Sequence, residues 1–197
     1  MARPKEFDPT LVLELAAAVF RTKGYEAASI QDLTEAMGIN RGSLYATYGD
    51  KEQLFVAVLD WYDANHEPAL WATLAAPDAG LPAIRAFLLD HAASLGRCDQ
   101  PAGCLLVDTA LGCAHIPSLA AAIRVRVGAL EALIYQVLRR AQGAGELTPT
   151  ADPLALARFL TATLHGMAVI SKVQRDPIAL RDIAMSALGA LPAGTGT

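Results

Sequence analysis

The chain has 197 residues, a length that suits one medium domain or two small ones. Apolar residues make up 53% of it and charged residues 18%, so the chain can bury a core and a disordered chain is excluded. The net charge of −4 argues against broad electrostatic adhesion to nucleic acid, although a local contact needs only a few donors.

The composition also favours one fold class. Alanine supplies 39 residues and aromatic side chains only 6%, which predicts an all-α protein because alanine is the best helix former. Three cysteines are too few for a disulfide scaffold, and the first residues lack the apolar run of a secretory signal. The most apolar stretch, Pro153 to Ser171, contains Arg158 and His165 and is expected to be a packing helix. We therefore expect a cytoplasmic protein that does not enter a membrane.

Two helices are well marked at the start of the chain. Asp8 can cap a first helix, which is expected to end at Gly24. A second, short helix is predicted from Ser29 to Gly38, with Asp32 completing a capping box. Both helices carry apolar residues at helical spacing.

A third short helix of about nine residues is predicted to begin at Asn40, after a tight turn that contains glycine. Two short helices joined in this way form a helix-turn-helix, whose second helix lies in the major groove of DNA. Leu44 and Tyr48 are expected to face the core. The opposite side is polar and carries Arg41, Ser43, Tyr45 and Thr47. Such a face is by itself usually only solvated, but here it follows two capped helices and precedes Lys51, which can reach a phosphate or be an ordinary surface lysine.

Residues 20–30 and 37–55 carry a resemblance to a known family. The segments FRTKGYEAASI and MGINRGSLYATYGDKEQLF resemble the DNA-binding domain of the TetR/AcrR regulators, over about residues 8–58. The resemblance implies a homodimeric, all-helical regulator, usually a repressor. Its first three helices would bind double-stranded DNA, and its later helices would hold a small-molecule inducer and the dimer interface.

Carried over by position, the resemblance implies two groups of DNA-binding residues. The groove-facing residues would be Arg41, Gly42, Ser43 and Tyr45, and those near the phosphate backbone would be Ser29, Tyr45, Thr47 and Lys51. Ala46 and Thr47 depart from the family, which often has a bulky aromatic residue or histidine at these positions. Six basic and eight acidic residues precede position 56, so we expect few phosphate contacts and a shallow salt dependence.

The rest of the chain is predicted to be helical. Helices are expected at Lys51–Asn65, Leu81–Leu95, Gly103–Ala114, Pro117–Gly143, Asp152–Val173 and Asp176–Leu188, with a linker at residues 75–80. The expected division is a helix-turn-helix domain at residues 1–50, a ligand-binding and dimerisation bundle at 51–192, and a flexible tail at 193–197.

The helix from Asp152 is rich in small residues, which let helices approach closely. They are Ala155, Ala157, Thr161, Ala162, Gly166 and Ala168. Burial within one subunit and a four-helix dimer seam with the last helix both explain them, and the resemblance favours the seam. A dimer is also needed because one short recognition helix reads only a few base pairs of a palindromic operator.

An apolar pocket with a few polar groups is predicted in the bundle. Its candidate lining is Trp61, Tyr62, Trp71, Phe87, His91, Leu106, Thr109, Leu130, Ile134 and Phe159. Residues of this kind are more often plain core. The scarcity of charge among them favours a neutral or aromatic ligand over a polyanion.

Cys104 follows Gly103 at the start of an apolar helix, where the helix dipole can favour a reactive thiolate. Some TetR-like regulators carry a similar Gly-Cys-Leu stretch and sense electrophiles or oxidants, while a buried free cysteine is more often an apolar filler. The spacing of Cys98, Cys104, Cys113 and His115 matches no standard zinc pattern, so neither a metal nor a cofactor is expected.

No catalytic motif is present, and no enzymatic activity is expected. The sequence predicts a transcriptional regulator that leaves its operator when a small apolar or electrophilic inducer binds. The alternatives are a helical scaffold that binds a protein, and a bundle that binds small molecules without binding an operator.

Overall fold

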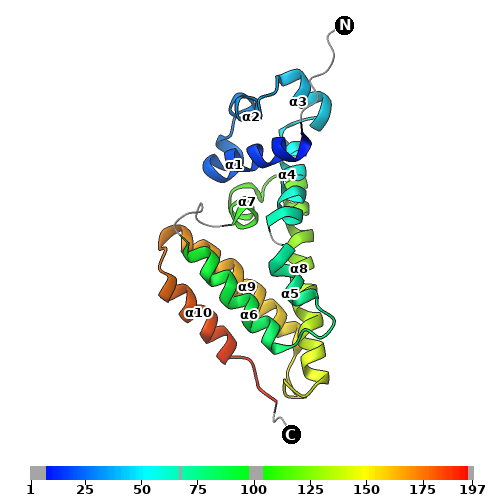
Figure 1. Ribbon diagram of the computed structural model, residues 1–197, viewed down its shortest axis with the longest axis vertical. Coiled ribbons are helices and arrows are strands. Elements are labelled where there is room, and N and C mark those ends of the chain that lie inside the picture. Colours follow the sequence, from blue (N-terminus) through cyan, green and yellow to red (C-terminus); the bar gives the residue numbers. More distant parts are fainter. Residues whose placement is uncertain (1–7, 67, 98–103, 195–197) are drawn as a thin grey trace. The chain divides into compact units, whose positions relative to one another are not determined.

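The computed structural model describes residues 8–66, 68–97 and 104–194 of the chain. In these ranges the regular structure is helical, apart from one isolated β-bridge between Leu147 and Ala193. Figure 1 shows the helices α1 to α10 in chain order. The all-α class predicted from the composition is confirmed.

Four helices form the amino-terminal part of the chain. They are α1 (Pro9–Ala27), α2 (Ile30–Met37), α3 (Arg41–Tyr48) and α4 (Lys51–His66). The first expectation was wrong in one detail, because α1 continues to Ala27 beyond Gly24. Gly24 nevertheless interrupts the regular helix, since its φ of 77° lies in the left-handed region that glycine tolerates.

The core around α1 and α4 is aromatic. Phe20 and Phe55 pack edge to face with ring centroids 4.6 Å apart, and Tyr25 lies 5.1 Å from Phe55. Leu33 of α2 and Leu44 of α3 are completely buried. Each of the short helices is thus anchored by apolar side chains, because an isolated helix of eight residues is unstable in water.

Six further helices complete the fold. They are α5 (Pro68–Ala75), α6 (Leu81–Gly96), α7 (Leu105–Cys113), α8 (Pro117–Gly143), α9 (Pro153–Val173) and α10 (Pro177–Gly189). The sequence did not predict α5, which is only eight residues long. Gly103, the expected start of α7, lies outside the described residues. Asp152 and Asp176 cap α9 and α10 as expected, each accepting two backbone N–H groups.

The described chain divides into two compact units. The first contains the residues up to His66 together with Asp108–Ile123, and the second contains Pro68–Val107 and the residues from Arg124 onward. The helices α7 and α8 therefore contribute residues to both units. This division is discontinuous and differs from the expected boundary at residues 50/51, because α4 groups with the amino-terminal helices.

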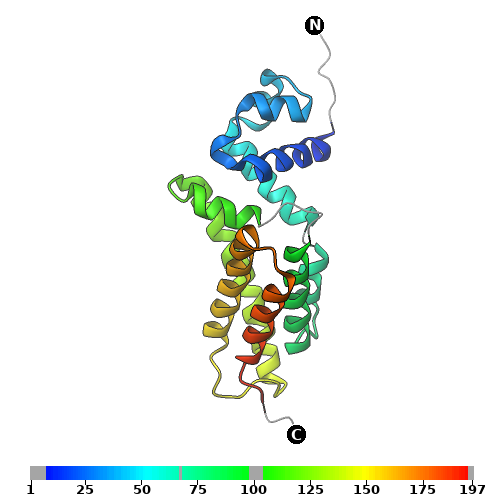
Figure 2. The same ribbon diagram turned by 90° about the vertical axis from the view of Figure 1, so that its left-hand side faces the viewer.

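The second unit is a helical bundle in which α6, α9 and α10 lie side by side (Figures 1 and 2). Leu88, Leu138, Leu160 and Leu180 are among its fully buried side chains. The first turn of α6 lacks a local side-chain cap. Glu146 fills that role, since its Oε2 atom accepts the backbone N–H of Leu81 at 2.6 Å.

The end of the described chain is held by backbone contacts. Besides the bridge between Leu147 and Ala193, the N–H of Gly194 donates to the carbonyl of Glu146 at 2.8 Å. The expected flexible tail was therefore wrong for these first two residues, because they pair with the loop after α8. Residues 195–197 lie outside the described part of the chain.

One described helix, α9, is long and apolar enough to cross a membrane by length and composition. Its buried face packs in the second unit, and Arg158 and Lys172 are exposed along it. These contacts support the expectation of a packing helix.

Candidate nucleic-acid interface

The turn between α2 and α3 is built from local backbone requirements. Gly38 ends α2 with a φ of 65°, a left-handed conformation that glycine adopts without strain. Asn40 then caps α3, and its Oδ1 atom accepts the backbone N–H of Ser43 at 2.8 Å. The two helices therefore meet at a tight, capped turn, as the sequence predicted.

The two faces of α3 differ in burial. Leu44 is completely buried, and Tyr48 is half-buried with a hydroxyl that has no hydrogen-bond partner in the described structure. Burial raises the pKa of Tyr48. The exposed residues are Arg41, Gly42, Tyr45, Ala46 and Thr47. Tyr45 is 48% exposed although it is a large aromatic side chain, so an apolar surface is available on this face.

Gly42 keeps the first turn of α3 open. A Cβ atom added to it would lie 3.2 Å from Oδ1 of Asn40, the atom that caps the helix. A larger residue would therefore crowd the cap. The absence of a side chain also lets another molecule approach this part of the backbone closely.

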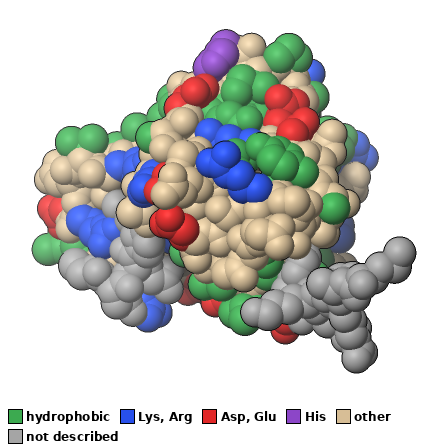
Figure 3. Space-filling model, turned by 90° about the horizontal axis from the view of Figure 1, so that it is seen from above, with side chains coloured by type: hydrophobic (Ala, Val, Ile, Leu, Met, Phe, Trp, Pro, Cys, Tyr) green, Lys and Arg blue, Asp and Glu red, His purple; other side chains and the backbone are tan. Residues whose placement is uncertain are grey.

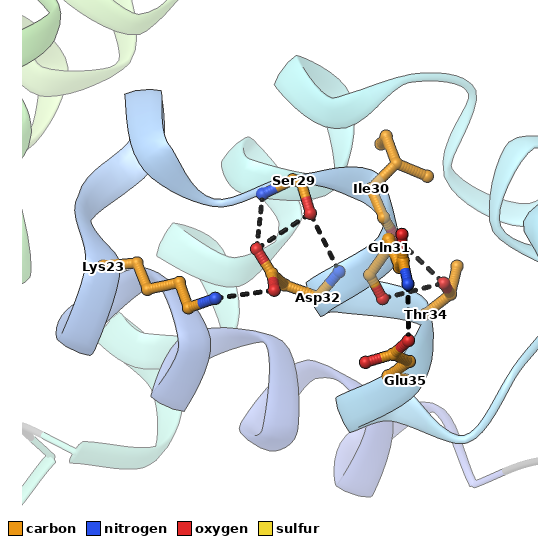
Figure 4. A network of polar contacts seen from close by, with 7 residues as sticks. All are labelled: Lys23, Ser29, Ile30, Gln31, Asp32, Thr34 and Glu35. Atoms are coloured by element: carbon orange, nitrogen blue, oxygen red, sulfur yellow. Dashed lines mark hydrogen bonds and ion pairs between the residues drawn. The ribbon is translucent and has the colours of Figure 1, made fainter.

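Ser29, one of the positions expected near phosphate, is engaged in the capping box of α2 (Figure 4). Its hydroxyl accepts the backbone N–H of Asp32 at 3.1 Å and donates to Oδ2 of Asp32 at 2.8 Å. Lys23 of α1 donates to Oδ1 of the same carboxylate at 2.6 Å. The hydrogen bond from Lys23, followed by those from Ser29, lowers the pKa of Asp32 to about 2.

The ion pair between Lys23 and Asp32 neutralises an acidic side chain beside the start of α2. This pair was not predicted from the sequence. A lysine and an aspartate nine positions apart on different helices have no periodic signal, so only the packing of α1 against α2 brings them together.

Lys51 lies at the start of α4 and contacts the end of α1. Its Nζ atom donates to the carbonyl of Glu26 at 3.3 Å and lies 4.5 Å from the centroid of the Tyr25 ring. Burial lowers the pKa of Lys51. Its ammonium thus links α1 to α4 in this structure, and a phosphate contact by Lys51 stays a prediction.

The segment Asp108–Ile123 packs in the same unit as these helices. His115 Nε2 lies 3.3 Å from Oε1 of Glu26 at the end of α1, and the hydroxyl of Ser118 donates to Glu52 of α4. Cys113 is buried, and burial, followed by the charge of Glu26, raises the pKa of its thiol. The corner between α7 and α8 is therefore fastened to α1 and α4 by polar contacts.

The distribution of charged side chains agrees with the excess of acidic over basic residues counted in the amino-terminal sequence. In the view of Figure 3 the Lys and Arg side chains form small groups among apolar, polar and acidic ones and do not make one continuous basic surface. A contact with DNA through this face would therefore depend on a few placed side chains.

The structure divides the predicted pocket residues between the two units. Trp61, Tyr62 and Thr109 belong to the first unit. Those of the second unit are Trp71, Phe87, His91, Leu106, Leu130, Ile134 and Phe159. Of these, Phe87, Leu130 and Ile134 are buried.

Phe159 differs from the other pocket candidates because it is 43% exposed on α9. It lines a groove of about 390 Å³ together with residues of α10, including Ile183 and Ala187. Phe159 therefore faces a surface groove, and its part in binding a ligand stays a prediction. The sequence of an apolar helix does not reveal which neighbouring helix a given side chain contacts.

The small residues of α9 differ in burial, and Gly166 is intermediate between a buried set and an exposed set. Ala157, Thr161 and Ala168 are buried inside the second unit, whereas Ala155 and Ala162 are exposed. The exposed set continues along one side of α9 and onto α10 as large apolar side chains. These are Leu154, Phe159, Val169, Ile170, Val173, Ile178 and Met185. We call this set the α9–α10 apolar face.

Two cysteines lie within the described residues, and both are free thiols. Cys104 immediately precedes α7 and is partly accessible, packing against the core of the second unit. Cys98 lies outside the described residues. Among the residues that the structure describes, no group of three or more His, Cys, Asp or Glu side chains could hold a metal ion.

Comparison with known families identifies both parts of the chain. Residues 12–58 match the family of bacterial regulatory proteins called the tetR family, and residues 80–187 match the tetracyclin repressor-like C-terminal domain. The chain belongs to the TetR family. As a TetR-family protein it is a DNA-binding transcriptional regulator and not an enzyme.

Several relatives of this TetR-family chain match over most of its length. An uncharacterized HTH-type transcriptional regulator, YezE of Bacillus subtilis, is 36% identical over 184 residues, which are 92% of this chain and 95% of the relative. The HTH-type transcriptional repressor ComR of Escherichia coli is 33% identical, with 86% of this chain and 82% of the relative aligned.

A solved structure of the TetR family transcriptional regulator CifR, a cysteine mutant complexed with 26-base-pair operator DNA, is 34% identical to this chain. Its TM-score is 0.87, and the alignment covers 96% of this chain and 100% of CifR. The predicted family and helix-turn-helix fold are thus confirmed.

Proposed function

We propose that this TetR-family chain is a repressor that binds a palindromic operator as a homodimer and is released by a small apolar or electrophilic inducer. The observation that carries the proposal is the exposed face of α3, where Arg41, Gly42 and Tyr45 surround a capped helix start. Arginine can bind guanine or phosphate, and the open backbone at Gly42 allows close approach. The operator complex of CifR supports the same use of this fold.

The α9–α10 apolar face supports dimerisation. Val173 is 90% exposed and Ile178 is 72% exposed, and large apolar side chains gathered on a protein surface often mark an interaction site. The groove between Phe159 and α10 makes this face uneven, so that side chains of a second copy can pack into it. Helices from two copies would then form a four-helix seam.

The route from ligand to DNA is proposed to run along α7 and α8, because these helices contribute residues to both units. His115 and Ser118 hold their corner to Glu26 and Glu52. A ligand that binds the second unit more tightly in one arrangement of these helices would favour that arrangement. If the favoured arrangement does not bind the operator, the ligand releases the protein from DNA.

An electrophilic inducer would act through Cys104, which is partly accessible at the start of α7. A helix N-terminus favours the thiolate form of a cysteine, which is the nucleophile. We expect Cys104→Ser to make DNA release insensitive to N-ethylmaleimide in a gel-shift titration. Cys113→Ser is the matched control because that thiol is buried, and an unchanged response of the Cys104 variant would exclude the sensor.

The central experiment is a gel shift with DNA that flanks the chain's own gene, followed by footprinting. We expect a symmetric protected site and, by sedimentation of the complex, two chains for each site. If no fragment is retained, or if Arg41→Ala with Tyr45→Ala leaves binding unchanged, the proposed use of α3 is wrong. Retention by a single chain would exclude the homodimer.

A further inference from the structure

The second unit contains a buried polar atom that the DNA-binding role does not use. The Nε2 atom of His91, on α6, has no hydrogen-bond partner in the described structure. The ring stacks on Phe87 with its centroid 6.4 Å away and an interplanar angle of 15°. An unpaired polar atom inside an apolar core costs free energy unless something binds it.

The other ring nitrogen determines what Nε2 can bind. The His91 ring forms a hydrogen bond with the backbone of Leu164, and this bond favours the protonated ring, so the carbonyl accepts. Because Nε2 is the atom without a partner, Nδ1 donates this bond. Burial, the dominant effect, lowers the pKa of His91 to about 4, so the ring is neutral at pH 7. In that tautomer Nε2 is an acceptor and requires an N–H or O–H donor.

Two more polar side chains lie at the same place on α9. Thr161 is three residues before Leu164 on the buried side of the helix, about one turn away, and its Oγ1 atom also has no partner in the described structure. His165 follows Leu164 and is close enough to His91 for the two rings to interact electrostatically. Burial lowers the pKa of His165 as well.

The surroundings of this group are apolar and do not suit a charged ligand. The His91 residue keeps some accessible surface, while its Nε2 atom is buried. The buried residues described in the second unit are apolar, apart from Thr161 and Ser171. No buried Lys, Arg, Asp or Glu among them could neutralise an ion.

We infer that His91, Thr161 and His165 form the polar end of an internal binding site that takes an uncharged, largely apolar ligand through a hydroxyl or N–H group. The donor of the ligand binds Nε2 of His91, and the hydroxyl of Thr161 binds an oxygen or a second donor on the same ligand. This inference rests on the proposed ligand response and names the chemical class of the inducer.

The test uses the full-length protein and pairs of probes of similar shape that differ in a donor. The pairs are p-cresol with p-xylene, 2-naphthol with 2-methylnaphthalene, and indole with indene. Affinities are measured by isothermal titration calorimetry without DNA. We expect the donor of at least one pair to bind about tenfold more tightly than its partner, as one satisfied buried acceptor predicts. Hydrophobicity cannot explain this order, because the hydrocarbon of each pair is the more apolar molecule.

Three variants locate the preference. His91→Phe keeps a flat ring against Phe87 but removes Nε2, and Thr161→Val removes only the hydroxyl. We expect the first to abolish the preference and the second to weaken donor binding. Thr150→Val, at an exposed threonine after α8, is the matched control and should leave the preference unchanged.

A measurement on the unmodified protein covers the case in which His91→Phe does not fold. The ¹⁵N resonance of His91 Nε2 should move upfield when 2-naphthol is added, as an acceptor nitrogen does on hydrogen bonding, and should not move with 2-methylnaphthalene. Equal affinities within every pair, a preference that survives in His91→Phe, or no binding by any donor would overturn the inference. Loss of operator binding in a gel shift would instead concern the proposed function, since the titrations contain no DNA.

Discussion

The two units of this TetR-family chain present functional groups in opposite ways. In the first unit the candidate residues, such as Arg41 and Tyr45, are exposed polar or aromatic side chains on short helices that are fixed by caps. In the second unit the polar atoms of interest, on His91 and Thr161, are buried, and the exposed surface of α9 and α10 is apolar. The first unit therefore suits a large charged partner, and we propose that the second binds a small uncharged ligand and a second copy of the chain.

The largest effect is expected on the exposed face of the first unit. Arg41→Ala combined with Tyr45→Ala should weaken operator binding by roughly 1000-fold, because each side chain acts once in each protomer and contacts of this kind contribute about 1–3 kcal/mol. Fluorescence anisotropy with labelled operator measures the loss. Arg139→Ala, on the exposed side of α8, is the control and should bind normally. An affinity within a factor of two of wild type would contradict the comparison.

The apolar face of the second unit is expected to be the next most sensitive. A double change of Val173 and Ile178 to Glu places charge on residues that are 90% and 72% exposed, so folding should survive while the dimer dissociates. Analytical ultracentrifugation should then show monomers, and operator affinity should fall about 100-fold because bivalent binding is lost. Leu111→Glu, at an exposed leucine of α7, tests whether any exposed apolar residue gives the same result. A dimeric double variant would place the seam elsewhere.

The buried imidazole of the second unit should be visible in the pH dependence of stability. Burial lowers the pKa of His91 from 6.5 to about 4, so between these pH values the unfolded chain binds a proton that the folded chain does not. The free energy of unfolding therefore falls as the pH decreases through this window. His91→Phe should remove about 2–3 kcal/mol of that loss in urea unfolding at pH 7.5 and 4.5. The groups around His91, namely His165, Thr161 and the backbone of Leu164, are the same in both proteins, so the difference reports on His91 alone. If the free energy of unfolding of wild type and variant depends on pH in the same way, the His91 ring is not buried.

The smallest effect is expected in the capping network of the first unit. Ser29→Ala should lower the free energy of unfolding by about 1 kcal/mol, as the loss of an N-cap does, while Ser94→Ala at an exposed position of α6 should have no effect.

Lys23→Met should raise the pKa of Asp32 more than Ser29→Ala does, because the hydrogen bond from Lys23 has the larger influence on that pKa. A carboxyl-carbon NMR titration distinguishes the two, and an unmoved pKa would show that the network is not formed.

The sequence alone determined those features that depend on residues close together along the chain. Asn40 caps α3 through the N–H of Ser43, and Asp152 and Asp176 cap α9 and α10, over spans of two or three residues. Such contacts are encoded locally, so the helix starts and the helix-turn-helix could be predicted. The exposure of Tyr45, the residue after the buried Leu44, follows from helical spacing in the same way.

Only the tertiary structure decided which side chains meet across helices. Glu146 caps α6 from 65 positions away, and Lys51 turns toward Glu26 of α1. Thr161, which the sequence placed in a seam of small residues, is buried, whereas Phe159, which it placed in a pocket, is exposed on a groove. A helix with small and apolar residues on several sides can pack in more than one orientation, so its buried side is set by the shapes of its neighbours and not by its own periodicity.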